Sequence, residues 1–218
     1  MIEHHVTLCL DASSPVVHVG ILSDGRWQAL KKSRAESINA IFAGTAKCLR
    51  ETGRELKGID GFVFCEGPGS ILGIRLAAMA INTWRNLPEI GPIPIAAFGS
   101  LQAVAAILER GGVSRPFNVI SDYRKNLWNL LSISASSPPA PIVSAGPDEI
   151  AALSGQVYHI PTRAFGSAPP KCARQLDYDL TELPVIARNP GFLRPVEFAD
   201  SIQTNLPVYR KWQARRHR

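Results

Sequence analysis

One segment of the sequence combines the residue types that bind phosphate groups. The loop Gly67-Pro68-Gly69-Ser70 lies between an apolar, strand-like run and a helix-like run, and Gly73 follows in the first predicted helical turn. Glycines let backbone N–H groups approach an anion, and a helix N-terminus carries a partial positive charge. The loop lacks the Lys-Ser/Thr pair of a Walker A motif and the glycine spacing of a dinucleotide fingerprint. It predicts either an anion site or a tight turn capped by Ser70.

Two aspartates that follow apolar runs are further candidates for ligand binding. Asp11 could hold a metal-bound phosphate, or could form an Asx-type turn in a β-hairpin. Asp122 occupies the same place after a second apolar run about half a chain later, where it could pair with Arg124 or bind a ligand. Together these segments predict a possible nucleotide or anion site made of Asp11, Ser13, Gly67, Gly69, Ser70, Gly73 and Asp122.

Other catalytic and metal-binding patterns are missing from the sequence. The histidines form no H-x-x-x-H or H-E-x-x-H pattern, which argues against a metalloprotease. No G-x-S-x-G elbow is present, and the four cysteines form no C-x-x-C pair. We therefore predict no catalytic residue and no metal ligand. Buried, reduced thiols at Cys9 and Cys65 and the lack of a signal peptide pattern predict a cytoplasmic protein.

The elements that must position these residues follow from hydrophobic patterning and turn signals. Ser23-Asp24-Gly25 predicts a β-hairpin turn, and the four residues from Ser33 to Glu36 fit a helix-capping box. Gly53 is a plausible helix end. Predicted strands cover 6–10, 16–22, 26–31, 61–65, 93–97, 117–121, 127–133 and 157–160, and predicted helices cover 33–53, 71–86, 100–109 and 148–153.

The predicted helix over 71–86 is apolar around more than one face. Such a helix must be buried on several sides, and in a chain of this size part of that burial could come from another protein. The same pattern occurs at Asp11 and at Asp122: an apolar strand that ends in aspartate is followed by a turn and another strand. This repetition suggests two duplicated units.

Charge is concentrated at the C-terminus. The formal net charge is +6, and the tail over 210–218 contains Arg210, Lys211, Arg215, Arg216 and Arg218. A basic tail can contact RNA phosphates, or can be a solvated, frayed terminus. The uncharged stretch over 90–108 is as long as a membrane span, but its prolines and glycine divide it into a strand and a helix, so no membrane association is predicted.

Several motifs, in order, resemble the TsaB (YeaZ) family. Leu10-Asp11-Ala12-Ser13-Ser14-Pro15 resembles its opening I-D-T-S-T turn, and the ten residues from Glu66 to Arg75 resemble its G-P-G-S-F-T-G-[LIV]-R signature. Further matches are Phe98-Gly99-Ser100-Leu101 to V-S-S-L, the segment from Ile120 to Asn126 to I-D-A-R-R-x, and Pro207-Val208-Tyr209-Arg210 to P-x-Y-[LV]-R.

The resemblance implies an actin/Hsp70-like (ASKHA) α/β fold of two lobes, each with a mixed sheet flanked by helices. We assign the lobes to 1–98 and 99–218. It also implies a non-catalytic subunit that supports N6-threonylcarbamoyladenosine synthesis at tRNA position 37 by heterodimerising with a TsaD-like catalytic subunit, joined by a TsaE-like ATPase. The contact is expected to involve Ile38, Ile41, Phe42, Ile71, Leu72, Arg75 and Met79 on the two helices.

The chain also departs from the family pattern. Glu36-Ser37 stands where the family has His-Ser, Ile71-Leu72 replaces Phe-Thr, and Tyr123 replaces an alanine. These changes remove polar groups, so we expect no cofactor to be required by this chain, with ATP and magnesium possible at the interface of the complex. The alternatives are an active ATP-dependent phosphotransferase of the same fold and a stand-alone homodimeric scaffold. Contact with tRNA is expected to be indirect or through the basic tail.

Overall fold

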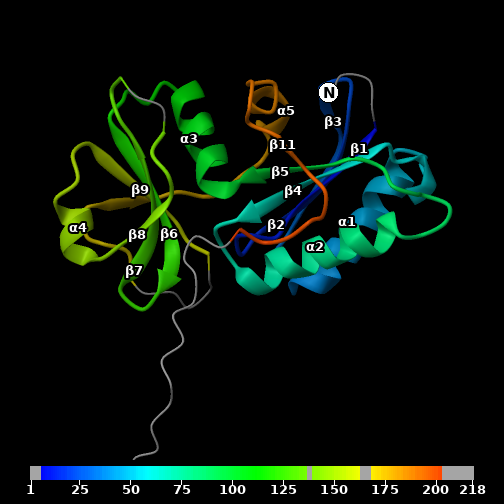
Figure 1. Ribbon diagram of the computed structural model, residues 1–218, viewed down its shortest axis with the longest axis horizontal. Helices are drawn as coiled ribbons and strands as arrows, with labels where there is room; N and C mark the ends of the chain where they lie inside the picture. The colour runs from blue at the N-terminus through cyan, green and yellow to red at the C-terminus, as the bar shows by residue number, and fades with distance from the viewer. Residues whose placement is uncertain (1–5, 137–138, 163–167, 203–218) are drawn as a thin grey trace, which may run out of the picture.

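The first β-sheet is built mainly from the N-terminal half of the chain. The computed structural model describes residues 6–136, 139–162 and 168–202 (Figure 1). Strand β1 lies beside β4 in parallel, β4 lies beside β5 in parallel, and β2 and β3 extend the sheet in antiparallel fashion. The order across the sheet is β11 (Arg194–Val196), β5 (Ile95–Gly99), β4 (Gly61–Gly67), β1 (Thr7–Asp11), β2 (Val17–Ser23) and β3 (Arg26–Ser33).

The second sheet repeats this arrangement on a smaller scale. Strand β6 pairs with β7 in antiparallel fashion and with β9 in parallel, as β1 does with β2 and β4. The predicted echo of two strand-led units is therefore confirmed. The order is β10 (Ala173–Gln175), β9 (Gln156–Ile160), β6 (Phe117–Arg124), β7 (Leu127–Ile133) and β8 (Val143–Ala145).

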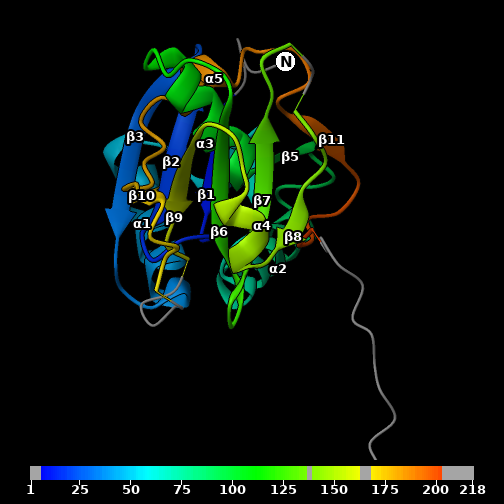
Figure 2. The ribbon, with the colours of Figure 1, turned by 90° about the vertical axis from the view of Figure 1, so that its left-hand side faces the viewer.

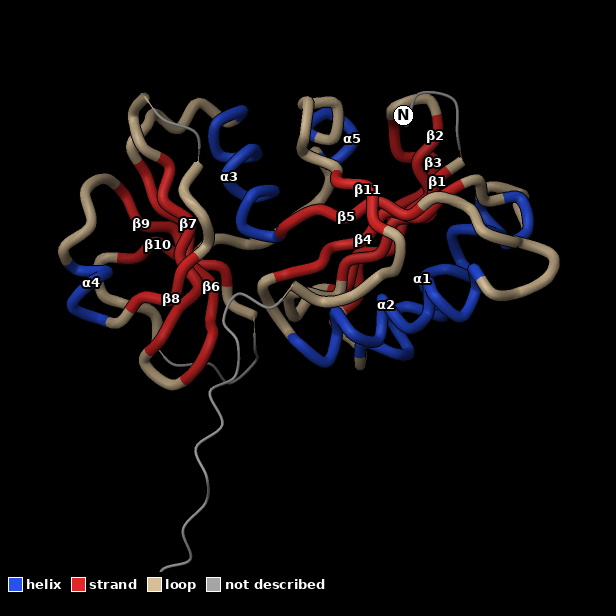
Figure 3. Tube along the Cα trace, in the orientation of Figure 1, coloured by secondary structure: helices blue, strands red, loops and turns tan. Residues whose placement is uncertain are grey.

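Helices cover the sheets on defined faces. Helices α1 (Ser37–Glu51) and α2 (Ile71–Arg85) lie together along one face of the first sheet (Figure 3), where they share one apolar core with it. Helix α3 (Ser100–Arg110) contributes to a second core that contains residues of both sheets, together with the short helix α5 (Leu183–Ile186). Helix α4 (Pro147–Ala151) packs on the other face of the second sheet, and the 3-10 helix η1 spans Leu56–Gly58.

Local sequence signals account for several element boundaries. Asp24 and Gly25 both have positive φ angles, as the predicted two-residue hairpin turn requires. Gly53, also with positive φ, follows the end of α1 as predicted. Ser70 caps α2, because its side chain accepts a hydrogen bond from the Gly73 N–H at 3.4 Å.

The predicted start of the first helix was wrong. Ser33 is the last residue of β3, and α1 begins at Ser37 after Glu36, with no side-chain capping bond. The Ser33 hydroxyl instead accepts a hydrogen bond from the Ala35 N–H at 3.2 Å. Pairing of Ser33 with Val17 continues the β-ladder through this position, so strand pairing prevails over the local capping signal.

The C-terminal half of the chain returns to the first sheet. Strand β11 pairs with β5, and Figure 1 shows it in orange beside green and cyan strands from much earlier in the chain. Figure 2, turned by 90°, shows β11 apart from β9 and β10, with which it shares the C-terminal half. The division into lobes at 98/99 stays a prediction. The structure adds that β11, from the C-terminal half, belongs to the sheet of the N-terminal half.

Two further points bear on the predictions from sequence. Within the part of the chain that the structure describes, no helix has the length and apolar character needed to cross a bilayer. The stretch over 90–108 contains β5 and most of α3, as the prolines and the glycine within it predicted. The basic tail over 210–218 and the motif from Pro207 to Arg210 lie outside the described residues.

Candidate functional site

The glycine loop is held against the turn that follows β1. The Ser70 N–H donates a hydrogen bond to the Ser13 carbonyl at 2.7 Å. A Cβ on Gly69 would lie 2.2 Å from the Ser13 carbonyl oxygen, and a Cβ on Gly73 would lie 2.1 Å from that of Ala12. Because no side chain tolerates such contacts, these two glycines are explained by the close approach of two backbone segments.

Asp11 lies at the centre of this junction and is fully buried. One carboxylate oxygen, Oδ1, accepts a hydrogen bond from the Ser13 N–H at 2.7 Å, which is the Asx-type turn expected as one alternative. The other, Oδ2, accepts a hydrogen bond from the Tyr178 hydroxyl at 2.5 Å. Both oxygens are therefore hydrogen-bonded within the chain, which fixes the buried carboxylate in place.

Tyr178 is a site residue that sequence reasoning missed. It lies 167 positions after Asp11, in a segment without clear periodicity, so no local signal indicated the contact. Burial and the neighbouring charge of Asp11 raise the pKa of the Tyr178 phenol well above its ordinary value. The phenol therefore remains a neutral hydrogen-bond donor at physiological pH.

The groups around Asp11 are held in their neutral forms. Burial, and secondarily the charge of Asp11, raises the pKa of the Cys9 and Cys65 thiols well above the ordinary value. Unreactive buried thiols at both positions agree with the prediction. His18 pairs with Asp11 across the β1–β2 ladder, and burial lowers its pKa although the charge of Asp11 opposes this shift.

Asp122 forms a second buried polar cluster, in the other sheet. Its Oδ1 lies 2.9 Å from His159 Nε2, and its Oδ2 accepts a hydrogen bond from the Thr162 N–H at 3.0 Å. Burial acts to raise the pKa of Asp122, but the hydrogen bonds from His159 and Thr162 outweigh it, so the pKa lies below the ordinary value. The predicted surface pair with Arg124 was wrong: the Arg124 guanidinium lies over the Tyr123 ring, 4.9 Å from its centroid.

His159 was also missed at the level of sequence. It lies on β9, the strand parallel to β6, at the end where Asp122 stands. The predicted strand over 157–160 contains His159, and Asp122 was a candidate because it follows an apolar run as Asp11 does. Nothing in the sequence, however, indicated which strand would lie beside β6.

The predicted partner-binding residues lie mainly on the exposed sides of α1 and α2. Of the seven, Ile41 is an error, because it is 1% exposed and belongs to the core beneath α1. Arg75 is exposed. The other five are large apolar side chains that are roughly half exposed or more: Ile38 (46%), Phe42 (51%), Ile71 (55%), Leu72 (69%) and Met79 (63%). We call these five the helical apolar surface.

The spacing of the helical apolar surface explains why it is exposed. Ile38 and Phe42 are four residues apart on α1, and Leu72, Arg75 and Met79 follow at intervals of three and four on α2. Each set therefore lies on one side of its helix, opposite the side that packs on the sheet. The two helices contact each other, and the rings of Phe42 and Trp84 meet edge to face at 5.7 Å between centroids.

Acidic, histidine and cysteine side chains do not gather into a metal site. Over the described ranges, no group of three or more such residues is placed to hold a metal ion. The seven predicted anion-site residues separate into two places: Asp122 lies in the second sheet, and the other six lie at the junction of the glycine loop with the turn after β1.

Comparison with solved structures identifies the class of fold. A YeaZ protein from Pseudomonas aeruginosa superposes with a TM-score of 0.65 at 18% identity, over 91% of this chain and 99% of that chain. A second Pseudomonas aeruginosa structure, of an uncharacterised protein with similarity to peptidase YeaZ, gives a TM-score of 0.63 at 18% identity, over 92% and 100% of the two chains. No protein-family model matches the sequence, and no curated protein matches it significantly.

These findings confirm the predicted fold. The chain has an actin-like ASKHA fold with two mixed sheets flanked by helices, and the YeaZ-like structures match 91–92% of its length.

Proposed function

We propose that this chain is a non-catalytic, partner-binding subunit of the TsaB (YeaZ) type, which supports N6-threonylcarbamoyladenosine synthesis on tRNA by heterodimerising with a TsaD-like catalytic subunit. The observation that carries the proposal is the helical apolar surface, which presents five large apolar side chains on two adjacent helices of a YeaZ-like fold. The ordered family motifs add to it.

An exposed apolar surface of this kind favours a protein partner. Single apolar side chains on a protein surface are ordinary, but a contiguous group is typical of an interaction site. Phe42, Met79 and Arg75 belong to the residue types that are enriched in protein interfaces. The buried sides of the same helices fill the core, and of the five exposed side chains Phe42 also packs against Trp84.

The engagement of Asp11 supports the non-catalytic side of the proposal. A carboxylate that holds a metal-bound phosphate must be accessible to that ligand, and the Asp11 side chain is fully buried. Both oxygens of Asp11 accept hydrogen bonds from Ser13 and Tyr178. An active phosphotransferase is therefore the weaker alternative, and we propose that any ATP and magnesium are bound at the interface of the complex rather than by this chain alone.

The remaining partners follow from the same proposal. A TsaE-like ATPase would join the heterodimer, tRNA would be contacted indirectly or through the tail over 210–218, and the setting would be the cytoplasm. A homodimer is compatible if it uses the helical apolar surface, because the two partners would then compete for one site.

Substitution of Met79 tests the proposed interface. Met79→Asp places a charge on a side chain that is 63% exposed, so the fold should persist, as checked by circular dichroism. We expect capture of the TsaD-like subunit from native extract to be lost, and Kd for the purified pair to rise at least about 30-fold. Val143→Asp is the matched control, because Val143 is 50% exposed on β8 of the other sheet. Unchanged capture by the Met79 variant would contradict the proposal.

Calorimetry with ATP and magnesium tests the non-catalytic assignment. We expect no binding to the isolated chain, and no difference between the wild type and Asp11→Ala. Binding that is lost in a folded Asp11→Ala variant, or robust ATP hydrolysis by the isolated chain, would contradict the non-catalytic assignment and favour the phosphotransferase.

A further inference from the structure

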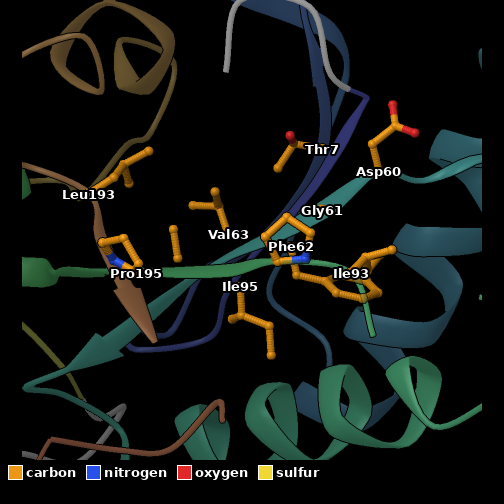
Figure 4. A pocket seen from close by; sticks show the side chains of 11 residues that line it. Thr7, Asp60, Gly61, Phe62, Val63, Ile93, Ile95, Leu193 and Pro195 are labelled. Atoms are coloured by element: carbon orange, nitrogen blue, oxygen red, sulfur yellow. The ribbon is translucent and has the colours of Figure 1, made fainter. Parts of the chain in front are cut away.

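A cavity of about 420 Å³ lies on the first sheet, away from the glycine loop and from the helical apolar surface. Its walls come from the starts of β1 and β4, from β5 and the segment before it, and from β11 and the residue that precedes it. Figure 4 shows Asp60 and Thr7 on one side of this space and Leu193 and Pro195 on the other. The volume is within the range of small-molecule sites, roughly 300–1,000 Å³.

The lining of the cavity is apolar with one polar side. Val63, Ala96 and Leu193 are typical of the walls, whereas Thr7 and Asp60 carry the only side-chain oxygens among the lining residues. Small-molecule sites commonly combine an apolar body with a few polar groups that set the orientation of the ligand. This cavity therefore suits a molecule with an apolar ring or chain and one polar end.

Asp60 sets the charge of that polar end. Its Oδ2 accepts a hydrogen bond from the Val6 N–H at 2.8 Å, which holds the carboxylate at the edge of the cavity. No ion pair joins Asp60 to a Lys, Arg or His elsewhere in the described ranges, and no other lining residue is charged. A carboxylate that has no ion-pair partner among the described residues and lies beside an apolar space favours a cation and disfavours an anion.

We propose that this cavity binds small apolar amines, with the apolar body against Val63, Ala96 and Leu193 and the protonated amine beside Asp60. The site is independent of the proposed function. It reaches Val63 on β4, whereas the glycine loop begins at Gly67, four residues further along the same strand, so the two are separated by roughly 13 Å.

Tryptamine and indole-3-propionate are suitable probes, because they share an indole ring and differ in the charge at the end of the chain. Each is titrated into the isotopically labelled full-length chain at neutral pH and low salt, and backbone amide shifts are followed by NMR. We expect tryptamine to shift the amides of Thr7, Gly61 and Ala96 and to bind more tightly than indole-3-propionate. Asp60→Asn keeps an acceptor for the Val6 N–H but removes the charge, so tryptamine binding should weaken about three- to fivefold, which narrows the difference between the probes.

A cavity-filling variant tests the location. A Cβ on Gly61 would lie 3.4 Å from the Pro94 carbonyl oxygen and 3.9 Å from Thr7 Oγ1, which is ordinary contact, so Gly61→Val should fold and fill the cavity. Binding of both probes should then be lost. Gly58→Val is the matched control, because no atom lies within 4 Å of a Cβ there, and it should bind as the wild type does.

Three results would overturn the proposal. These are no amide shifts at the cavity up to the solubility of tryptamine, equal affinity for the two probes, or unchanged binding in a folded Gly61→Val variant. If Gly61→Val does not fold, Ala96→Val on β5 fills the same cavity and carries the same expectation.

Discussion

Asp11 and Asp122 occupy equivalent places in the two sheets, but the chain uses them in different ways. Each lies near the end of the first strand of a hairpin whose first strand also pairs in parallel with a later strand. Asp122 is bonded to His159 and Thr162, which belong to the same half of the chain. Asp11 is bonded to its own turn and to Tyr178, which comes from the other half.

The Asp122 cluster is therefore confined to one half of the chain, whereas the bond between Asp11 and Tyr178 joins the two halves. Tyr178 belongs to a segment that packs on the first sheet, since Trp27 on β3 donates to the Leu180 carbonyl at 3.2 Å and Lys32 pairs with Asp179. The nearby histidines also differ. His159 contacts Asp122 through a ring nitrogen. Neither ring nitrogen of His18 has a hydrogen-bond partner among the described residues, and its ring meets the Tyr178 ring edge to face. The two similar fold units therefore share a buried carboxylate but differ in the residues that bind it.

Removal of the Asp122 carboxylate should have the largest effect. Asp122→Ala leaves the His159 ring nitrogen and the Thr162 N–H buried without their partner, so we expect about 3 kcal/mol loss in the free energy of unfolding at neutral pH. Because the folded pKa of Asp122 is lowered, its contribution is present above about pH 4 and is lost as the pH falls through the folded pKa.

Urea unfolding of Asp122→Ala between pH 3 and pH 7 measures this effect. The gap from the wild type should be widest at neutral pH and narrow in acid. Asp177→Ala is the control, because Asp177 is exposed and should change stability by less than about 0.5 kcal/mol. A gap that does not vary with pH would mean that the charge of Asp122 is not what stabilises the cluster.

Loss of the Tyr178 hydroxyl should have the next largest effect. Tyr178→Phe keeps the ring against His18 and leaves Asp11 Oδ2 without its donor, so we expect about 2 kcal/mol loss of stability. A double-mutant cycle with Asp11→Asn measures the coupling between the two side chains. Additive effects would show that the bond between the two halves contributes little.

His18 should make stability sensitive to mild acid. Its folded pKa is lowered, so the unfolded chain binds the proton first and stability falls as the pH drops below about 6.5. His18→Phe keeps an aromatic ring beside Tyr178. Between pH 7 and pH 5 the free energy of unfolding of this variant should fall by about 1 kcal/mol less than that of the wild type, as measured by urea unfolding. Equal pH dependence in the variant and the wild type would exclude His18 as the cause.

The sequence predicted the hairpins and helices because their signals are local. The turn at Asp24 and Gly25, the cap at Ser70 and the spacing of Leu72 and Met79 each depend on residues a few positions apart. Ile41 shows the limit of such reasoning, because helical spacing identifies apolar residues but not which of them face the core.

The partners of the two aspartates could not be predicted for a different reason. Tyr178 and His159 reach Asp11 and Asp122 only after the sheets have assembled, and the segment that holds Tyr178 has no regular periodicity. The glycine loop shows the same limit: Gly69 and Gly73 are required by the backbone of Ser13 and Ala12, a long-range contact that a glycine in the sequence does not distinguish from an anion site.

The smallest expected effect concerns the exposed pair beside Tyr178. Asp179 accepts from Lys32 at 2.6 Å, and although burial acts to raise its pKa, the bonds from Lys32 and Thr181 lower it to about 2. Asp179→Asn keeps the oxygen that accepts both hydrogen bonds from Thr181 and removes the charge. We expect a loss of at most about 0.5 kcal/mol, because both side chains are largely exposed, and a smaller loss in high salt. A loss as large as that of Tyr178→Phe would mean that this surface pair, rather than the buried bond to Asp11, holds the segment on the first sheet.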